Sequence, residues 1–511
     1  MYKDGVLTIS DFGKGAANSP IEGFGHMEGV EIFDTPGVVK IANAVSGIGP
    51  SFTGLCVSTV KDIYGNYYFL TNDGKLYVNF SGTPIQTGLG TVYDMVIAKD
   101  FLFVRHSTVI SIYGPLAGPA VWYGNWSSNG SYLSGTPGGF SASNYGKMVV
   151  AGDPDTLTDS IFLANGNRVV KLKSLTTGTP LVATYDAGLA LPDGRYATTL
   201  VSMGDKIFVG AGGGSTWATR NNYKVADIYP WDKVSADAYS LPVRLNESGI
   251  QAMITDNNKL YVVAGTNGNI YVTDSTNYLK LRRLPWVQSK GFNQSMQVYP
   301  NAIAFNNAGN LLIGTSTLQD SYSTDTSHQS FHGIYEVNVN ALGYPTVLKH
   351  TAGSSGGLTG ATTALTIGSI FSGSDDSIIF GWQSGSTYGI NLTNFYCLTG
   401  YIESPLIIVG SRIAQKTFQQ IEFNLVHPLK PDAFFPTTAD GQTISIYYRE
   451  TLDASYSLIG TYTYKNLGSV IGFNDKAKMA DLQQVQIKIV LTQPISSLAT
   501  DNINLLNVRI W

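Results

Sequence analysis

The sequence is poor in charged residues, cysteine and histidine, and it has no long apolar run. Charged residues make up 13% of the 511 residues, and the formal net charge is −4 with no block of one sign. Such a chain lacks the basic surface that holds nucleic acid or an anionic membrane. No apolar stretch approaches the roughly 20 residues that span a bilayer, and the start has no secretory signal. We therefore expect a chain that is made and folded inside a cell, without a membrane-spanning segment.

The residues that are abundant are typical of a β protein. The chain contains 56 glycines, 30 tyrosines and 22 phenylalanines. Aromatic and β-branched residues fit a pleated sheet, and Gly and Asn supply tight turns. The stretch NNKLYVVAGTNGNIYVTD, residues 257–274, has the form of a turn, an alternating apolar strand, a second turn and a second strand. Similar phrases begin at Asn72, Ala98, Tyr145, Gly204, Ala308 and Asp375.

These seven phrases predict a β-propeller over residues 51–395, within an all-β chain. Each phrase belongs to a unit of three or four short antiparallel strands. Successive phrases start about 26 to 67 residues apart, which brackets the length of a propeller blade. Such a small sheet buries both faces only by stacking against its neighbours. We expect seven blades, with six as an alternative because the first two phrases are close enough to share one blade. The competing arrangement is a β-helix or a set of stacked sandwiches.

The two ends of the chain predict two further parts. Residues 396–511 are expected to form an antiparallel β-sandwich, because their strands are longer and alternate apolar with polar residues. In QQVQIKIVLTQ the set expected to face inward is Val485, Ile487, Ile489 and Leu491, and the set expected to face outward is Gln484, Gln486 and Lys488. The first 50 residues, rich in Gly and Pro, are expected to form an extended arm. Its short strands would lie in GVEIFD and GVVKIAN.

The two cysteines, Cys56 and Cys397, are far apart in the sequence. Two such residues form neither a disulfide framework nor a cysteine metal cluster. We expect two buried free thiols, since cysteine is among the most often buried residues. If the propeller closes by pairing its two ends, Cys56 and Cys397 would approach one another.

Two groups of residues are candidates for metal binding, and neither has a complete motif. Asp153, Asp155 and Asp159 have a spacing loosely like a calcium loop, but the central glycine and the closing glutamate are missing. A polar loop between strands is favoured. His328 and His332 are four residues apart, which would place them on one face of a helix. Their surroundings are loop-like, so chance spacing is favoured.

Two glycine-rich motifs are also incomplete. GAGGGST, residues 210–216, lacks the Gly-Lys-Ser/Thr ending of a phosphate loop and opens no helix, so a glycine-rich β-turn is expected. GGGSTWATR, residues 212–220, is the nearest approach to a sialidase Asp-box and has no aspartate in place. A glycosidase needs two carboxylates across a sugar, and the sequence alone does not pair them. We therefore predict no catalytic, cofactor-binding or metal-binding residue.

Two insertions, residues 114–140 and 318–333, are rich in Gly, Ser, Asn and aromatic residues. Insertions of this kind tend to lie on one face and make contacts. Within the first, WYGNWSSNGSY (Trp122 to Tyr132) offers aromatic rings for stacking on a sugar or for packing in a subunit contact. The subunit contact is favoured.

Short motifs at both ends resemble those of virion proteins of tailed phages. The opening has the pattern DF-x-x-G (Asp11 to Gly15), followed by V-x-I-F-x-x-P-G-x-V (Val30 to Val39). GYIESPLIIVGSRIAQKTFQQIEFNL, residues 400–425, resembles the segment Y-x-x-S-P-x-x-x-x-G-x-x-x-x-x-K-x-F-x-x-I that precedes the C-terminal sandwich of those proteins. With a propeller between these motifs, the chain resembles the tail nozzle or muzzle proteins of short-tailed, podovirus-like phages.

This resemblance implies a non-enzymatic structural protein of the virion tail, made in the host cytoplasm. Such proteins form a homo-oligomeric ring, commonly a hexamer, that closes the DNA channel, opens for ejection and contacts adaptor or fibre proteins. Genomic DNA passes only as cargo, and a mildly acidic chain agrees with that, because phosphate repulsion removes the binding energy. No cofactor is implied. The alternatives are a propeller that binds host-surface glycan and, third, a glycan-cleaving enzyme.

Overall fold

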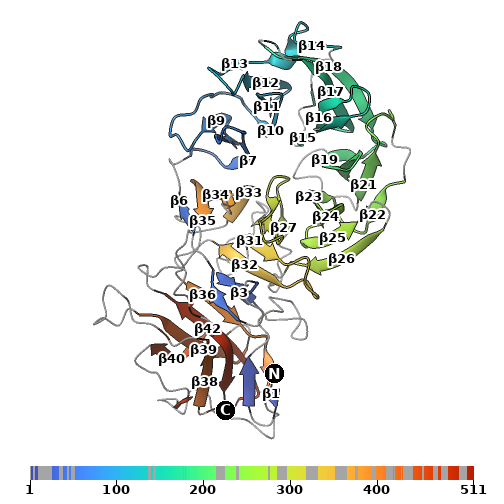
Figure 1. Cartoon of the computed structure of the whole chain (residues 1–511). Helices are drawn as coiled ribbons and strands as arrows, with labels where there is room; N and C mark the ends of the chain where they lie inside the picture. Colours follow the sequence, from blue (N-terminus) through green and yellow to red (C-terminus); the bar gives the residue numbers. More distant parts are fainter. Residues whose placement is uncertain are drawn as a thin grey trace.

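The computed structural model shows an all-β chain with two parts, a β-propeller and a β-sandwich (Figure 1). The residues that it describes are 2–3, 6–9, 26–33, 38–42, 45–47, 52–135, 140–141, 146–176, 178, 180–214, 225–237, 241–273, 277–284, 296–317, 332–351, 365–373, 378–393, 399–409, 418, 420–426, 429, 441–451, 454–463, 470–472, 482–493, 503 and 505–510. Within these residues the helical structure is a single 3-10 turn, η2 (Trp126–Ser128).

Seven small antiparallel sheets form the blades of the propeller, and we number them 1 to 7 in chain order. From the inner to the outer strand they are β7–β9 (Cys56–Lys61, Tyr67–Thr71, Lys75–Val78), β10–β13 (Val92–Ala98, Phe101–His106, Val109–Gly114, Val121–Tyr123), β15–β18 (Met148–Asp153, Thr158–Asn165, Arg168–Thr176, Val182–Ala190), β19–β22 (Tyr196–Met203, Lys206–Gly212, Ala226–Trp231, Val243–Leu245), β23–β26 (Ile250–Asp256, Lys259–Ala264, Asn269–Thr273, Tyr278–Arg283), β28, β29, β31 and β32 (Ile303–Phe305, Leu311–Gly314, Gly333–Val337, Thr346–Thr351), and β33–β35 with β6 (Leu365–Ser372, Ile378–Ser384, Thr387–Thr393, Val45–Gly47). A short pair, β27 (Met296–Gln297) with β30 (Ser316–Thr317), adjoins blade 6.

The blades form a closed circle. The inner strand of each blade contacts the inner strand of the next, and β33 of blade 7 contacts β7 of blade 1. Hydrophobic clusters lie between neighbouring blades around the circle, including one that joins blade 7 to blade 1. Both faces of each small sheet are therefore buried, as the recurring phrase predicts. The propeller is confirmed.

The uneven spacing of the phrases has a simple cause. Each phrase falls in a different blade, but the strand that it forms differs. The phrase from Asn72 forms the third strand of blade 1, the phrase from Ala98 forms the second strand of blade 2, and the phrase from Tyr145 forms the first strand of blade 3. The first two phrases are close because one lies late in its blade and the next lies early. Seven blades are therefore correct, and the alternative of six is wrong.

The sandwich packs two sheets around one core. One sheet has the order β1 (Tyr2–Lys3), β2 (Val6–Ile9), β43 (Leu505–Ile510), β38 (Gln420–Leu425) and β41 (Val470–Gly472). The other includes β36 (Thr399–Glu403), β42 (Gln484–Thr492), β39 (Thr443–Arg449) and β40 (Ser457–Thr463), and β37 (Ile407–Ile408) pairs with β42. The apolar residues from both sheets form one cluster.

The alternation predicted for β42 is confirmed on its inner face and needs one correction on the other. Val485, Ile487, Ile489 and Leu491 are all buried in the sandwich core. Gln486 was expected to face outward, but it is only 4% exposed. Its side chain accepts a hydrogen bond from Arg449 Nε and donates one to the carbonyl of Ser404. A glutamine tolerates this burial because both ends of its amide are satisfied.

The first 50 residues supply strands to both parts, whereas the sequence suggested a separate extended arm. β1 and β2 join the sandwich, and β6 closes blade 7 by pairing with β35. Between them, β4 (Val30–Glu31) pairs with β5 (Lys40–Ile41), in the two segments predicted to form strands. β3 (His26–Glu28) pairs with β32 of blade 6 on one side and with β36 on the other. One sheet therefore runs from blade 6 into the sandwich.

Candidate functional site

The aspartates with calcium-like spacing form a structural ion pair in blade 3. Asp153 is buried and accepts hydrogen bonds from Lys171 Nζ at 3.0 Å, Ser160 Oγ at 2.8 Å and the backbone N–H of Asp155 at 3.0 Å. Lys171 also contacts Asp155 at 2.7 Å, while Asp159 is exposed. Burial opposes the charge on Asp153, but these hydrogen bonds and Lys171 lower its pKa overall. The lysine ammonium occupies the position that a cation would need.

The two histidines of the predicted pair are not brought together by any described contact. His328 lies outside the described residues. His332 lies just before β31 and is 3% exposed, and its Nδ1 has no hydrogen-bond partner in the described part of the chain. Burial lowers the pKa of His332 to about 4. The ring is therefore neutral at physiological pH and contributes as part of the core.

This burial predicts a dependence of stability on pH. The unfolded chain protonates His332 below about pH 6.5, whereas the folded chain resists protonation until about pH 4. The free energy of unfolding therefore falls as pH decreases through this interval. Between about pH 7 and pH 5 the His332 contribution amounts to a loss of about 2 kcal/mol. Chemical denaturation at both pH values should show a smaller loss for His332→Gln, and equal losses in the two chains would contradict the prediction.

The glycine-rich segment at residue 210 begins inside a strand, whereas the sequence predicts a glycine-rich β-turn there. Gly210 lies within β20, in the middle of blade 4. A Cβ at this position would meet Ile250 Cγ2 of blade 5 and Thr199 Cγ2 at 2.8 Å. Glycine is thus required for close packing of two blades. The remainder of the two glycine-rich motifs, residues 215–220, lies outside the described residues.

The aromatic stretch from Trp122 to Tyr132 does not present its central ring to a ligand or a subunit. Trp126 is completely buried, and its Nε1 donates a hydrogen bond to the carbonyl of Leu181 at 2.7 Å. Its ring packs edge to face against Phe103. Trp126 therefore joins blades 2 and 3 within one chain, which corrects both interpretations of this residue. Most of the second insertion, residues 318–331, lies outside the described residues.

Cys56 is a buried free thiol, as predicted. Its Sγ lies 3.5 Å from Ser369 Oγ of blade 7 and 3.4 Å from Thr59 Oγ1. Burial raises the pKa of this thiol, so it is kept in its unreactive form. Cys56 thus lies where the first and last blades meet. Cys397 lies outside the described residues, so the expected approach of the two cysteines stays a prediction.

A polar cluster on the propeller axis is the first of two sites that join distant parts of the chain. Asp94, on the inner strand of blade 2, is 1% exposed. It accepts hydrogen bonds at 2.8 Å from Ser58 Oγ of blade 1, from Asn301 Nδ2 beside blade 6 and from the backbone N–H of Met148 of blade 3. Lys147 Nζ lies 3.5 Å from its carboxylate.

The partners of Asp94 show that the cluster bridges the axis. Blades 2 and 6 are not neighbours in the circle, so Asp94 and Asn301 meet only across its centre. Asn301 also donates to the carbonyl of Val57 at 2.9 Å, accepts a bond from Lys147, and pairs with Ser369 of blade 7. The cluster lies near the ends where the inner strands begin. The central channel of the propeller is thus crossed by side chains at that end.

The second site is the joint between the propeller and the sandwich. Lys349 of β32 lies between two carboxylates, with its Nζ 2.7 Å from Glu31 of β4 and 2.5 Å from Glu336 of β31. Glu336 also accepts hydrogen bonds at 2.8 Å from Asn306 and Asn310. Burial opposes the charge of Lys349, but the two carboxylates raise its pKa overall. A charged lysine therefore connects the amino-terminal segment to blade 6.

The two segments that carry the phage resemblance meet at this joint. Met27 pairs with Ile402 and Glu28 with Tyr401, so the strand before Val30 lies beside the start of the 400–425 segment. The contact is close at two glycines: a Cβ on Gly29 would meet the carbonyl of Thr399 at 2.8 Å, and a Cβ on Gly400 would meet the carbonyl of Gly29 at 2.3 Å. The described parts of these motifs therefore form one structural unit. The DF-x-x-G pattern at Asp11 lies outside the described residues.

Neither a metal cluster nor a membrane-spanning helix adds to these sites among the described residues. No group of three or more His, Cys, Asp or Glu side chains there is arranged to hold a metal ion. No helix there has the length and apolar character needed to cross a membrane.

No family model matches the sequence, and no curated protein matches it. Solved structures with a similar fold include the extracellular domain of a hybrid two-component system from B. thetaiotaomicron, at 15% identity and a TM-score of 0.43 over 85% of this chain and 48% of that one. The chain thus spans about half the length of that protein.

Two further solved structures match a smaller share of the chain. Virginiamycin B lyase from Staphylococcus aureus matches 68% of this chain and 98% of its own, at 11% identity and a TM-score of 0.38. The propeller domain of Cps50 (Swd1) from Myceliophteria thermophila matches 69% of this chain and 99% of its own, at 10% identity and a TM-score of 0.42. At such low identities these similarities concern the fold alone.

Proposed function

We propose that this chain is a non-enzymatic structural subunit of a virion tail, a nozzle or muzzle protein that assembles into a ring around the DNA channel. The terminal motifs carry the resemblance, and their described parts form the joint between the two domains. The partners would be further copies of the chain and the adjoining adaptor or fibre proteins. DNA would pass as cargo, and the chain would reside in the tail after synthesis in the host cytoplasm.

The observation that carries this proposal is the distribution of exposed apolar side chains on the propeller. Strands within a blade are antiparallel, so the turn between its first and second strands and the turn between its third and fourth lie at the same end. Every exposed large apolar residue of the described blades lies at this end. We call them the apolar rim: Ile63, Tyr64, Val121, Leu157, Val182, Val234, Leu241, Tyr278, Leu279 and Leu342.

An apolar rim of this kind is costly for a protein that remains alone in water. Turn tips are normally Gly, Asn, Asp, Ser or Pro, yet Ile63 and Leu157 are 90% exposed at their turns and Leu342 is fully exposed. Apolar side chains gathered on one face mark contact sites for other proteins. The opposite end of the blades, where the axial cluster crosses the channel, carries no such residue among those described. One face is thus suited to contact a neighbour.

The buried charges support a structural role. Lys171 neutralises Asp153, Lys349 lies between Glu31 and Glu336, and Arg195 Nε lies 2.7 Å from Asp227. A general acid or base needs a carboxyl that is free to exchange its proton with a substrate. These carboxylates are instead fixed by cations of the same chain. Their arrangement joins strands and domains.

The location in the particle is tested by immunogold electron microscopy. Antibodies raised against the purified chain should label tailed particles that contain it, at the tail end remote from the capsid. Six-fold or similar rings in negative-stain images of the purified chain would independently support the ring. Label on the capsid, or particles that lack the chain altogether, would contradict the proposed function.

The apolar rim makes a further prediction about assembly. The double variant Leu157→Asp with Leu342→Asp should weaken association of the chain with itself or with its tail neighbours by about tenfold or more, because it places charges in an apolar contact. Sedimentation or native mass measurement would report the change. Ile408→Asp is the matched control, since Ile408 is 77% exposed but lies in the sandwich. If the double variant assembles as well as the control, the rim is not the contact surface.

A further inference from the structure

The outer strand of blade 5, β26, differs from those of the other blades. An outer strand leaves one row of backbone N–H and C=O groups without a partner, and a long exposed one is a site for pairing with another chain. β13, β22 and β6 are short outer strands of three residues each, and β9 of blade 1 has four residues. Three outer strands are longer: β18 with nine residues, and β26 and β32 with six residues each.

Two of these three long strands are covered by an added strand of the same chain. β14 (Leu133–Ser134) pairs with β18, and Leu133 is completely buried. β3 pairs with β32, and Gly29 N–H donates to the carbonyl of Leu348 at 3.0 Å. The fold thus extends the long outer strands of blades 3 and 6 by β-strand addition. Among the described residues, β26 pairs only with β25.

The open edge of β26 carries exposed apolar side chains. Tyr278 is 48% exposed and Leu279 is 56% exposed, and both belong to the apolar rim. Exposed edge strands in soluble proteins are usually short or carry inward-pointing charges or proline. β26 is six residues long and contains no proline, and its charges Arg282 and Arg283 and its register shift lie in its second half, after Lys280. Its first half therefore offers both a backbone edge and an apolar surface.

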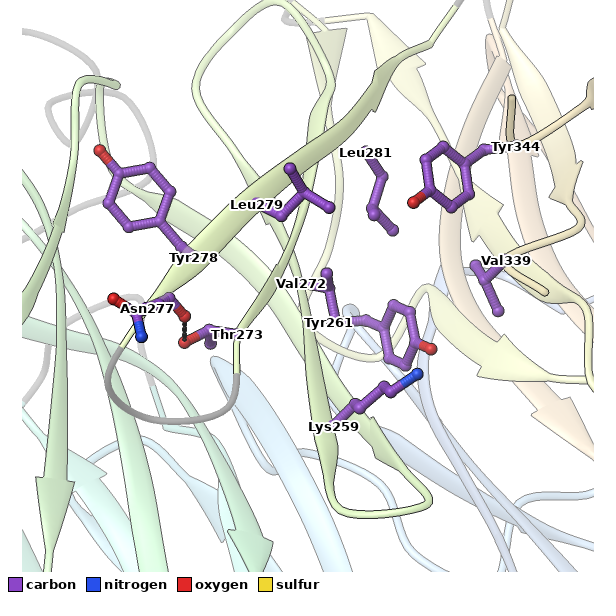
Figure 2. A pocket seen from close by; sticks show the side chains of 10 residues that line it. All are labelled: Lys259, Tyr261, Val272, Thr273, Asn277, Tyr278, Leu279, Leu281, Val339 and Tyr344. Carbon is purple, nitrogen blue, oxygen red and sulfur yellow. Dashed lines mark hydrogen bonds between the residues drawn. The ribbon is translucent and has the colours of Figure 1, made fainter. Parts of the chain in front are cut away.

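A groove lies beside this edge, between blades 5 and 6 (Figure 2). It has a volume of about 320 Å³ and is open to solvent. On the blade 5 side, three cross-strand neighbours form a row of side chains, since Tyr261 pairs with Val272 and Val272 pairs with Leu279. Val339 and Tyr344 form its blade 6 side, as Figure 2 shows. A strand added to β26 would continue this row, and its next side chain would enter the groove.

The polar groups of the groove indicate the charge of its occupant. Lys259 Nζ and the hydroxyls of Tyr261 and Tyr344 have no hydrogen-bond partner among the described residues. Lys280, exposed on the opposite face of β26, is likewise without an ion-pair partner there. At the far end, Arg282 donates to the carbonyls of Gly343 and Tyr344 and closes the groove against blade 6. Two free ammonium groups and two hydroxyl donors favour a ligand that carries carboxylates.

We propose that β26 accepts an extended segment of another polypeptide as a fifth strand of blade 5, with an apolar side chain in the groove and acidic side chains facing Lys259 and Lys280. The backbone edge supplies affinity, while the groove and the two lysines supply selectivity. This inference goes beyond the proposed function, because strand addition to a single chain requires no ring. It assigns a site that the apolar rim alone does not define.

The test uses the full chain and a displayed library of random peptides of about 10 residues, the upper length of a typical strand. Peptides that bind the natural chain are kept, and those that also bind the Leu279→Asp variant are removed. This variant changes the groove at an exposed position. The best peptide is then synthesised in its natural form and with alternate amides N-methylated. Binding is measured by fluorescence anisotropy, and its position is found by hydrogen exchange of the β26 amides.

We expect enrichment of peptides in which an apolar and an acidic residue share the groove side, with the acidic one toward Lys259, and a further acidic residue lies on the other side toward Lys280. Exchange protection is expected at Tyr278–Arg283. N-methylation should weaken binding by about tenfold or more, because it removes the donors that pair with the edge. Lys280→Glu changes an exposed residue and should leave folding intact. It should weaken binding of the selected peptide and strengthen binding of a peptide with Lys in place of the acidic residues. The absence of enrichment over Leu279→Asp, or protection at another site, would overturn the proposal. Unchanged thermal melting of both variants separates lost binding from lost folding.

Discussion

Replacing Lys349 by methionine is expected to lower the free energy of unfolding by about 3–5 kcal/mol, because it leaves two buried carboxylates without their cation. Glu31 and Glu336 both contact the lysine Nζ at hydrogen-bond distance. Methionine fills a similar volume, so the loss comes from the charges and not from a cavity. Lys349 and Glu31 belong to segments 318 residues apart. The effect should therefore appear as separation of the amino-terminal segment from blade 6.

Denaturation followed by both tryptophan fluorescence and circular dichroism measures this loss. Lys173→Met is the matched control, because Lys173 pairs with Asp186 at 2.7 Å while both side chains remain about 30% exposed. Exposed pairs contribute about 0–1 kcal/mol. A Lys349→Met variant no less stable than the Lys173→Met variant would show that the joint does not depend on this ion triad.

Removal of the Asp94 carboxylate is expected to destabilise the propeller by about 3–5 kcal/mol. Asp94→Ala leaves three donors without their acceptor, namely Ser58 Oγ, Asn301 Nδ2 and the N–H of Met148, and it leaves Lys147 without its counter-charge. These donors belong to blades on both sides of the axis. The circle should therefore open more easily, with faster hydrogen exchange in the inner strands of blades 1, 2 and 6.

Two variants help to interpret that measurement. Asp94→Asn keeps the shape of the side chain but places an amide where the carboxylate accepts hydrogen bonds. It should therefore recover only part of the stability that Asp94→Ala loses. Asp186→Ala removes a half-exposed carboxylate from the outer strand of blade 3 and should change stability by less than about 1 kcal/mol. If Asp94→Ala behaves like Asp186→Ala, the axial cluster does not hold the circle together.

The propeller was predictable because its strands and turns are local. β24 and β25 are joined by a glycine-containing turn, and their alternation alone identifies a hairpin. The number of blades followed in the same way, since each blade holds one recurring phrase. The inner face of β42 was predictable for a similar reason, because alternation every second residue identifies the buried side of a sheet. Gln486 escaped prediction because its hydrogen-bond partners, Arg449 of β39 and Ser404 just after β36, lie far from it in the sequence.

The axial cluster and the joint were not predictable from local patterns. Asp94 is the one charged residue of the apolar strand VYDMVIA, and Lys349 directly follows the apolar Val347 and Leu348 in TVLKHT. A lone charge in such a strand is a usable signal that a buried partner exists, because an isolated buried charge is costly. The partner itself comes from elsewhere in the chain. Pairings such as β3 with β32 join segments separated by hundreds of residues, and a single sequence contains no periodicity that would indicate them.

The pairing of β2 with β43 has a mechanical consequence. Leu7 lies opposite Ile510 and Ile9 lies opposite Val508, so the chain before Val6 and the chain after Ile510 leave this ladder at the same end, and the chain before Val6 then turns back as β1. Once β1 has been detached from β2, a force that pulls the termini apart would load the hydrogen bonds between β2 and β43 one after another. Blades 1 to 7 lie between β2 and β43 in the chain and would carry none of that load until this ladder had opened.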